Sequence, residues 1–444
     1  MSRAESMAEQ EVVEICQKLL QIDTSNYGDD SGPGERKAAE YCAELLREVG
    51  LECEFFEARP GRTSVVTRIP GADPTRPALV VHGHTDVVPA EAKDWTHPPF
   101  AGVIADGCLW GRGAVDMKDM DAMILAVARD IMRSGRKPPR DLIIAMFADE
   151  EAGGVAGAQW AVENRPELFA GASEAISEVG GYSIDIAGQR AYLIQTAEKG
   201  LSWQRLIAKG TAGHGSAINK DNAVVELAKA ISAISNYEWP IRLTATTTAL
   251  LAGIAKLTGL PFDPDASPSE LRTQINDLAA AIGTGAKFVL PSVQTTANPS
   301  GLTAGYKVNV IPGFAEATLD MRPLPGDAEN AKATIRSLIG SKVDLVPIHE
   351  DIDLEAPLDT PLVAAMKTAL HSEDPGAPIL PYCLSGGTDN KSLARLGITG
   401  YGFAPLRLPP ELDFTGMFHG VDERVPIESL KFGTRVLSRF LSLC

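Results

Sequence analysis

The chain has 444 residues, of which 44% are hydrophobic, and a formal net charge of −17 at pH 7. This length and apolar content predict one large buried core and a second domain, and the acidic balance excludes a nucleic-acid-binding protein because phosphate contacts need clustered Lys and Arg. The start of the chain lacks the apolar core of a signal peptide, no later window is apolar enough to span a membrane, and the six scattered cysteines contain no CxxC pair, so we expect a soluble cytoplasmic protein with reduced thiols.

Helical and strand patterns alternate over the first part of the chain. Apolar residues at helical spacing predict helices over residues 9–22, 35–50, 120–134 and 158–164. Short apolar runs predict strands over residues 63–69, 78–88, 141–151 and 174–179. Alternating elements with continuously apolar strands indicate an α/β fold, in which a mostly parallel sheet is covered by helices on both faces.

The segment 200–353 has a different pattern. We expect strands over residues 201–210, 306–311, 315–323 and 342–348 and helices over residues 222–235 and 328–340. Residues 241–304 are rich in Thr, Ala, Gly and Pro and give no clear prediction. Helices on one side of a few antiparallel strands form a smaller α+β domain, inserted between residues 1–199 and 354–444 of the first domain.

Acidic and histidine side chains follow three of the predicted strands. His84 and Asp86 end one strand, the DEE run at 149–151 ends a second, and Glu178 ends a third, while Asp116 lies in a Gly-flanked loop between the first two. Parallel strands place their ligands at their carboxyl ends, and strand alternation puts His84 and Asp86 on one face. Histidine and carboxylates without thiolates suit zinc, cobalt or manganese, and carboxylates can bridge two ions whose charge stabilises clustered acids.

Taken singly, each of these patterns also occurs in proteins that bind no metal. An HxD pair is a weak metal signature, and a DEE run is often a solvated loop or a helix N-terminus, where acids interact favourably with the helix dipole. Their joint occurrence at successive strand ends favours a metal site.

Eight short segments extend the pattern along the chain. HGHTDVVP, GRGAVDMKD, FADEE, GHGS, NVIPG, DMRPLPG, SGGTD and FHGVDER occur in that order. In this order they resemble the M20 metallopeptidases, and the resemblance covers nearly the whole chain. That family contains glutamate carboxypeptidases, aminoacylases, acetylornithine deacetylases, succinyl-diaminopimelate desuccinylases and dipeptidases. The competing hydrolase motifs HExxH and GxSxG and the P-loop are absent from the sequence.

The resemblance implies a site for two divalent metal ions. We expect zinc, with cobalt or manganese as alternatives. Asp116 would bridge the two ions. His84 and Glu178 would complete one metal site, and Glu151 and His419 would complete the other.

Catalytic roles follow from the same resemblance. Glu150 would be the general base for a water activated by the metals, and Asp86 would orient His84. His214, in the inserted domain, would donate to the oxyanion, and in dimeric relatives the equivalent histidine reaches into the partner's active site. The peptide bond after the bridging aspartate would be cis, as in relatives.

Substrate recognition needs a further cation, because many substrates of the family carry a free α-carboxylate beside the scissile amide. Arg322, in DMRPLPG, is the expected partner, since its fork can bind both carboxylate oxygens. Asn309 would donate to the oxyanion or the carboxylate, and main-chain donors would come from Gly386, Gly387 and Thr388. An Arg before Pro-Leu-Pro can also simply pair with a surface acid.

The leading hypothesis is a di-metal hydrolase that cleaves an amide or peptide bond next to a free carboxylate, as carboxypeptidases and aminoacylases do. The alternatives are a dipeptidase, a deacetylase or desuccinylase of an amino-acid intermediate, a deaminase-like C–N hydrolase, and a binding protein that keeps the fold without catalysis. DMKDM in place of DMKGG and SEVGG in place of a GEPT-like segment weaken the case for desuccinylation. We expect a small peptide or N-acyl amino acid as substrate, no nucleic-acid or membrane partner, and a homodimer through the inserted domain, which would serve as a lid and dimerisation domain.

Overall fold

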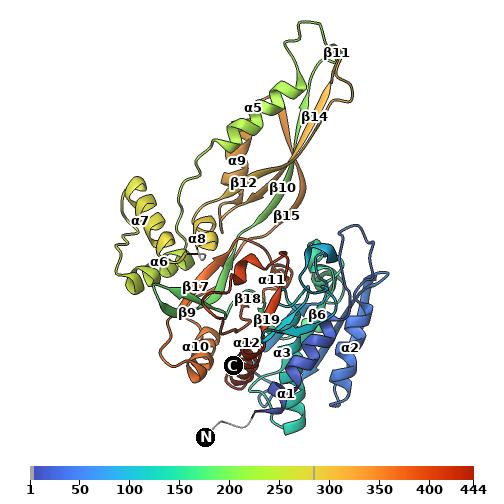
Figure 1. Ribbon diagram of the computed structural model, residues 1–444, viewed down its shortest axis with the longest axis vertical. Helices are drawn as coiled ribbons and strands as arrows, with labels where there is room; N and C mark the ends of the chain where they lie inside the picture. Colours follow the sequence, from blue (N-terminus) through green and yellow to red (C-terminus); the bar gives the residue numbers. More distant parts are fainter. Residues whose placement is uncertain (1–4, 284–285) are drawn as a thin grey trace. The chain divides into compact units, whose positions relative to one another are not determined.

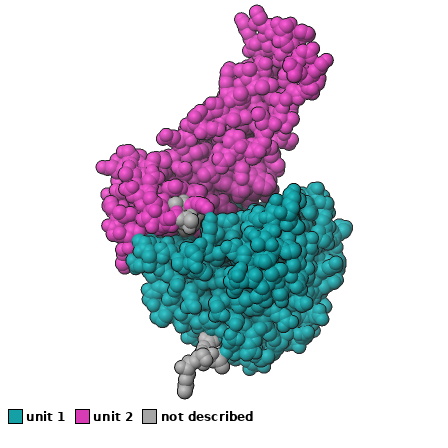
Figure 2. Space-filling view, in the orientation of Figure 1, with its two compact units in different colours: residues 1–196, 356–381, 388–444 teal, residues 197–355, 382–387 magenta. Residues whose placement is uncertain are grey.

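The described residues form two compact units, coloured teal and magenta in Figure 2. The computed structural model describes residues 5–283 and 286–444. Of these residues, unit 1 comprises 5–196, 356–381 and 388–444, and unit 2 comprises 197–283, 286–355 and 382–387. The segment 382–387, which we expected in the first domain, groups with unit 2.

The larger sheet is parallel at its centre and antiparallel at its sides. Its strands lie in the order β1 (Glu54–Arg59), β2 (Arg62–Ile69), β6 (Leu142–Phe147), β3 (Ala78–His84), β7 (Ala172–Ser177), β18 (Thr399–Gly402), β9 (Gln189–Glu198) and β16 (Leu354–Glu355), with β8 (Ser183–Ile186) and β17 (Ile379–Leu384) also paired to β9. Figure 1 labels its strands β6, β9, β17 and β18. The neighbours β6, β3, β7 and β18 run parallel, whereas β1–β2, β2–β6 and β18–β9 are antiparallel. The predicted α/β class is confirmed.

Helices cover both faces of the central strands. The helices of unit 1 are α1 (Met7–Leu20), α2 (Arg36–Arg47), α3 (Lys118–Ser134), α4 (Ala158–Asn164), α10 (Pro361–Glu373), α11 (Asn390–Ala394) and α12 (Ile427–Leu441). On one face of β3, Val80 shares a buried cluster with Ala161 of α4 and Leu393 of α11. On the other face, a Cβ at Gly83 would lie 2.1 Å from Asp121 Oδ1 of α3. Glycine at this position therefore lets α3 lie close against β3.

A short antiparallel sheet of unit 1 has the strand order β19 (Arg424–Pro426), β5 (Cys108–Trp110) and β4 (Val103–Ala105). Arg424 is the register partner of Trp110, and its guanidinium lies 4.5 Å from the centre of the indole ring. The pairing brings the loop before β19 next to the loop after β5.

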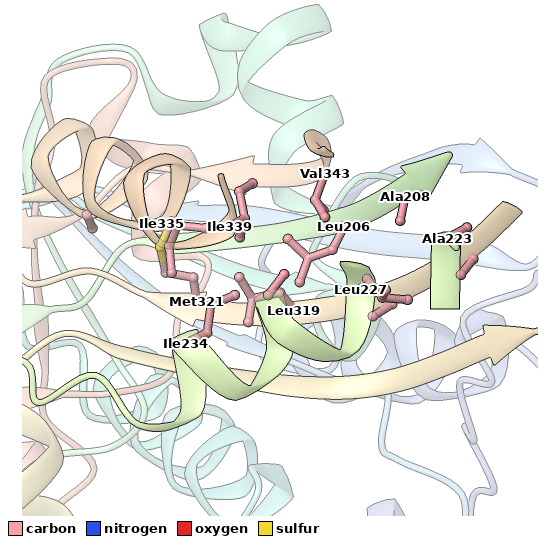
Figure 3. Close-up of a cluster of buried hydrophobic side chains, with 14 of the residues drawn as sticks. Leu206, Ala208, Ala223, Leu227, Ile234, Leu319, Met321, Ile335, Ile339 and Val343 are labelled. Carbon is pink, nitrogen blue, oxygen red and sulfur yellow. The ribbon is translucent and has the colours of Figure 1, made fainter. Parts of the chain in front are cut away.

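Unit 2 contains an antiparallel sheet with helices packed on one face. The strand order is β12 (Thr296–Ala304), β14 (Phe314–Arg322), β10 (Leu201–Lys209) and β15 (Val343–Asp351), and the helices are α5 (Ala223–Ser235) and α9 (Ala328–Ile339). Figure 3 shows their shared core, in which Leu206 of β10 and Leu319 and Met321 of β14 meet Leu227 of α5 and Ile335 of α9. Alternate residues of β10 and β14 are buried, as expected for a sheet covered on one side.

Residues 241–304, which gave no clear prediction, contain three helices and a strand among their described part. They are α6 (Ala245–Thr258), α7 (Pro268–Ala281), α8 (Ala286–Ser292) and β12. Capping boxes begin two of these helices, Thr244 with Thr247 in α6 and Ser267 with Glu270 in α7. None of the helices that the structure describes is long and apolar enough to cross a membrane.

The predicted strand over residues 306–311 was wrong in length. Its last two residues alone form β13 (Val310–Ile311), which pairs with β11 (Gly213–His214). The Val310 N–H donates to Lys307 O at 3.1 Å and closes a turn where we expected extended backbone. Val308 is fully exposed, so the apolar alternation here belongs to a surface turn and not to a half-buried strand.

Candidate active site

The acids and histidines of unit 1 gather where three parallel strands end. β3 lies between β6 and β7, with His84 level with Phe147 and Val81 level with Ile176. The run 149–151 follows β6 directly, and Glu178 follows β7. Parallel neighbours share a carboxyl edge, so the chain order predicts this convergence and the register explains it.

Two loops complete the cluster. Asp116 lies between β5 and α3, and His419 lies between a short 3-10 turn (Phe414–Gly416) and β19. Asp116 Oδ1 is 3.2 Å from His84 Nε2, and Asp116 Oδ2 is 3.3 Å from His419 Nε2. His419 Nε2 also lies 3.0 Å from Glu151 Oε2, and His84 Nε2 lies 3.7 Å from Glu178 Oε1. The two oxygens of Asp116 thus face two separate histidine–carboxylate pairs.

The donor set fits divalent metal ions. Ligand atoms of His84, Asp116 and Glu151 lie within 4.8 Å of one another, as do those of His84, Glu150 and Glu178. Across residues 5–283 and 286–444, buried polar atoms without a hydrogen-bond partner include His84 Nε2 and Glu151 Oε1. A buried acceptor without a donor is costly, and a dication between these atoms would satisfy both.

Burial and mutual repulsion perturb the protonation of the cluster. Burial raises the pKa of Glu178 to about 7 and raises the pKa of Glu150 well above its usual value. Burial also acts to raise the pKa of Asp116, but His419 and His84 hold it below its usual range. Protons therefore balance the negative charge where cations would otherwise do so.

Asp86 has a broader role than the sequence indicated. We expected its carboxylate to orient His84. Asp86 Oδ1 lies 3.6 Å from His84 Nδ1, and the main-chain oxygen of Asp86 lies 3.0 Å from the same nitrogen. The carboxylate also accepts the N–H of Glu150 on Oδ1 and the N–H of Glu151 on Oδ2, each at 3.1 Å. Asn26 Nδ2 donates to Oδ2 at 2.9 Å. Asp86 therefore holds the turn that carries the two neighbouring acids.

Asp149, the first acid of the run, is buried, although DEE runs often lie in solvated loops or at helix N-termini. Its Oδ2 accepts the Ala156 N–H at 2.8 Å, and its Oδ1 accepts from Asn26 Nδ2 at 3.1 Å. Its φ of 67° is left-handed, a conformation that aspartate tolerates better than most residues. The three successive acids therefore point to different partners.

In unit 2, His214 lies on a two-stranded ribbon formed by β11 and β13, and Asn309 immediately precedes β13. The Ser216 N–H donates to His214 Nδ1 at 3.2 Å, and the Ser216 hydroxyl lies 2.8 Å from the same nitrogen. Because Nδ1 accepts an N–H, a neutral ring carries its proton on Nε2, which can donate. The Gly215 N–H donates to the main-chain oxygen of Asn309 at 2.9 Å.

The other expected substrate residues are distributed over both units. Arg322 ends β14, where its Nε donates to Asp320 Oδ1 at 2.7 Å and its Nη2 to Asp320 Oδ2 at 3.2 Å. Residues i and i+2 share a strand face, which explains this pairing. Gly386 and Gly387 belong to unit 2, whereas Thr388 belongs to unit 1, where its Oγ1 accepts the Asn390 N–H at 3.2 Å.

Sequence patterns did not reveal two polar residues that hold the metal-site loops. Asn26 contacts Asp86 and Asp149 from a loop far earlier in the chain. Glu423 accepts three main-chain N–H groups of the Asp116 loop. The available signal for Glu423 was its place in FHGVDER, four residues after a predicted ligand.

Comparisons with known proteins agree with this geometry. The pattern of "Peptidase family M20/M25/M40" matches residues 80–443. Aminoacylase-1 of Sus scrofa is 26% identical over 440 residues, covering 97% of this chain and 94% of that protein. The N-fatty-acyl-amino acid synthase/hydrolase of Bos taurus is 28% identical over 396 residues, covering 86% and 77%. An M20 family metallo-carboxypeptidase from Sulfolobus solfataricus is similar in structure, with a TM-score of 0.71 and 17% identity over 98% of this chain and 99% of that one.

Fold and site together define a hydrolase with a histidine and carboxylate cluster at the carboxyl edge of a parallel sheet. The chain belongs to peptidase family M20/M25/M40, since the family pattern spans most of its length. The peptide bond between Asp116 and Met117 is cis, which confirms the expectation from the resemblance.

Proposed function

We propose that this protein is a di-metal amide hydrolase that releases an amino acid from an N-acyl amino acid or a small peptide with a free carboxylate. The observation that carries the proposal is the arrangement of Asp116, which presents one oxygen to His84 and the other to His419 at 3.2 and 3.3 Å. A carboxylate that faces a different histidine with each of its two oxygens is suited to bridge two ions.

We propose that Asp116 holds both ions, His84 and Glu178 hold one, and Glu151 and His419 hold the other. Histidine and oxygen ligands without thiolates favour zinc, with cobalt and manganese as alternatives. When bound, two such ions supply Lewis-acid charge that polarises a carbonyl and lowers the pKa of water.

Glu150 is the proposed general base. Its Oε2 lies 3.9 Å from His84 Nε2, and its side chain stays 16% exposed, so it can reach both the cluster and a substrate. Asp86 accepts the Glu150 N–H and thereby fixes the main chain of Glu150. The Glu150 carboxylate itself is not one of the proposed metal ligands. Glu150 would take a proton from water and pass it to the departing amine.

Arg322 is the proposed reader of the substrate carboxylate. Its guanidinium already forms a two-point contact with the carboxylate of Asp320, the geometry that a substrate carboxylate would use. Asn309 and the main chain of Gly386, Gly387 and Thr388 are proposed to add donors to the carboxylate or to the oxyanion. The names of two relatives, aminoacylase-1 and the N-fatty-acyl-amino acid synthase/hydrolase, support an N-acyl amino acid.

His214 is the proposed oxyanion donor. Its Nδ1 is occupied by Ser216, so Nε2–H remains as the donor. We propose that it acts in a homodimer, across to the partner's site. A location in the cytoplasm is part of the same proposal. Within the part of the chain that the structure describes, no disulfide joins the cysteines at positions 16, 42, 53, 108, 383 and 444.

The proposed dimer would use an exposed apolar surface of unit 2. On α5, Val224 and Val225 are 38% and 47% exposed, and on the neighbouring edge strand β12 Leu302 is 67% exposed. Val225 also lines a shallow groove along α5 with Ala228 and Ser232. A second copy could pair the same edge and helix with itself, which is how a two-fold interface works.

A substrate panel tests the proposed function. Purified protein with added zinc is incubated with N-acyl amino acids, dipeptides, N-acetyl and N-succinyl amino-acid intermediates, and C–N substrates that release ammonia. The expected result is free amino acid from N-acyl or peptidyl substrates and loss of turnover when the carboxylate is amidated. Release of ammonia without amino acid would assign the deaminase-like alternative, and activity on dipeptides alone would assign a dipeptidase.

A further inference from the structure

The loop that carries Asp116 depends on a side chain from elsewhere in the chain. Between β5 and α3 this loop has no helix or strand of its own. Its main chain converges on Glu423, which is fully buried. Oε1 of Glu423 accepts the N–H of Val115 at 2.7 Å and of Asp116 at 3.1 Å, and Oε2 accepts the N–H of Gly113 at 2.9 Å.

Arg112 supplies a fourth donor and the countercharge. Its Nη1 donates to Glu423 Oε2 at 2.8 Å, and its Nη2 donates to Gly420 O at 2.7 Å. Arg112 is only 4% exposed. Four donors nearly saturate a carboxylate, and hydrogen bonds to a charged acceptor are stronger than neutral ones.

Glu423 belongs to the loop that carries His419. Its own main-chain oxygen accepts the Gly111 N–H at 3.0 Å, so backbone and side chain of one residue both hold the segment before Asp116. His419 has a left-handed backbone with φ 57°, an uncommon conformation that its surroundings must maintain. Hydrogen bonds of Glu423 therefore connect the loop of Asp116 to the loop of His419. The two side chains themselves approach to 3.3 Å, between Asp116 Oδ2 and His419 Nε2.

We propose that Glu423 is a positioning residue that sets the separation of Asp116 and His419 and thereby the metal affinity of the site. This inference rests on the proposed function, because it takes these two side chains to be metal ligands. Glu423 touches neither metal nor substrate and acts through the loop it holds. Contacts of this kind behind metal ligands commonly change metal affinity by about 10- to 100-fold.

Glu423→Gln removes the charge with almost no change of shape. The amide can accept on one side but presents N–H groups to the donors on the other, so two of the four hydrogen bonds are lost. Asp422→Asn is the matched control. The Asp422 carboxylate lies one residue earlier in the same loop and accepts the N–H and hydroxyl of Thr96, each at 2.7 Å, outside the Asp116 loop.

Both variants are compared with wild type in full-length protein stripped of metal. Zinc affinity is measured against a competing chelator, the visible spectrum is recorded after Co²⁺ loading, and kcat and KM are measured at saturating zinc on the best substrate of the panel. We expect wild type and Asp422→Asn to bind two ions equally well. Glu423→Gln should bind zinc about 10- to 100-fold more weakly, with an altered Co²⁺ spectrum and a lower kcat at nearly unchanged KM.

Zinc affinity and a Co²⁺ spectrum equal to wild type in Glu423→Gln would overturn the inference and leave the proposed function intact, even if the variant unfolds at a lower temperature. Failure of wild type itself to bind zinc would instead overturn the proposed function. If Glu423→Gln does not fold, Glu423→Asp keeps the charge but shortens the side chain by one methylene. Weaker zinc binding in that variant supports the inference, and unchanged binding overturns it.

Discussion

At Asp86, a single carboxylate receives donors from two segments that are distant in the sequence. One is the turn carrying Glu150 and Glu151, and the other is the loop carrying Asn26. Asn26 also donates to Asp149, and its Oδ1 accepts from Arg62 Nη2 at 2.8 Å. Asn26 is 5% exposed, so it connects buried charges that would otherwise face each other directly.

The contacts of Asn26 lead to a prediction. Asn26→Ala removes the donor shared by Asp86 and Asp149. Asp86 Oδ2 keeps the Glu151 N–H, but Asp149 Oδ1 loses its hydrogen-bond donor, and such a loss costs about 1–3 kcal/mol. We expect kcat/KM to fall by about tenfold or more, with zinc still bound, measured by steady-state kinetics and elemental analysis. Asp29→Asn, at an exposed turn of the same loop, serves as the control and should match wild type. Unchanged kcat/KM in Asn26→Ala would show that the turn carrying Glu150 keeps its position without Asn26.

A second prediction concerns Arg322. Arg322→Lys keeps the charge but loses the planar fork that contacts both oxygens of Asp320. We expect KM to rise or kcat/KM to fall at least about tenfold, or roughly 1.4 kcal/mol, with unchanged zinc content. Amidating the substrate carboxylate should then harm wild type far more than the variant. Equal losses in both enzymes would mean that Arg322 binds only Asp320.

The residues at strand ends could be predicted from the sequence because strand position alone brings them together. His84 and Glu178 follow buried apolar runs, and neighbouring parallel strands end at one edge. Asn26 and Glu423 could not be predicted in this way. Asn26 donates to carboxylates, and Glu423 accepts main-chain N–H groups, of loops that are distant in the sequence. No periodic pattern in the sequence indicates such contacts.

At the scale of elements, the proposed dimer would use an exposed surface of unit 2. The edge strands of its sheet are β12 and β15, and edge strands present unpaired main-chain groups. Exposed apolar residues accompany the β12 edge, with Leu302 on the strand and Val225 on the adjacent α5. The β15 edge also carries an apolar residue, Ile348, which is 49% exposed.

These two edges allow a matched test. The double variant Leu302→Lys, Val225→Lys places like charges opposite each other in the proposed two-fold interface, so we expect it to sediment as a monomer at about micromolar concentration. Activity should fall with it, because His214 would no longer reach a partner's site. Ile348→Lys on the other edge is the control and should remain dimeric. A wild-type protein that sediments as a monomer, or a monomeric variant with full activity, would contradict the proposal.

The elements themselves were predicted unevenly. Amphipathic helices of unit 1 such as α1 follow the helical period, and its buried strands such as β6 are continuous apolar runs. The helices α6 and α7 were missed because their Thr, Ala and Pro content obscured the pattern, although capping boxes at Thr244 and Ser267 mark where they begin. The segment 306–311 was assigned too long a strand because a hydrogen-bonded turn can also carry alternating apolar residues.

At the scale of the whole molecule, the acid cluster should make the metal-free protein less stable as pH rises. Burial raises the pKa of Glu178 to about 7, and contacts with Asp116 and Glu151 raise the pKa of His419 to about 10. Each group binds its proton more tightly in the folded than in the unfolded chain, so its contribution is complete below its unfolded pKa and is lost as pH rises through its folded pKa. The lowered pKa of Asp116 acts in the opposite direction, but only below about pH 4.

We therefore expect the unfolding temperature in chelator to fall by several degrees between about pH 5 and pH 8. Zinc should remove most of this dependence, because it replaces the protons. Circular dichroism melts at three pH values, with chelator and with zinc, measure the effect. An unfolding temperature that rises with pH in chelator would contradict the charge balance proposed for the cluster.

The central claim is a two-metal hydrolase in which Glu150 is the base and its neighbour Glu151 is a metal ligand. The most direct test compares Glu150→Gln with Glu151→Gln. Zinc per chain is measured by elemental analysis, and turnover is measured on the best substrate of the panel. Glu150→Gln should keep two zinc ions and lose turnover by at least about 100-fold, since it removes only the base. Glu151→Gln should lose zinc. Equal zinc loss in both variants, or wild-type turnover in Glu150→Gln, would contradict the assignment.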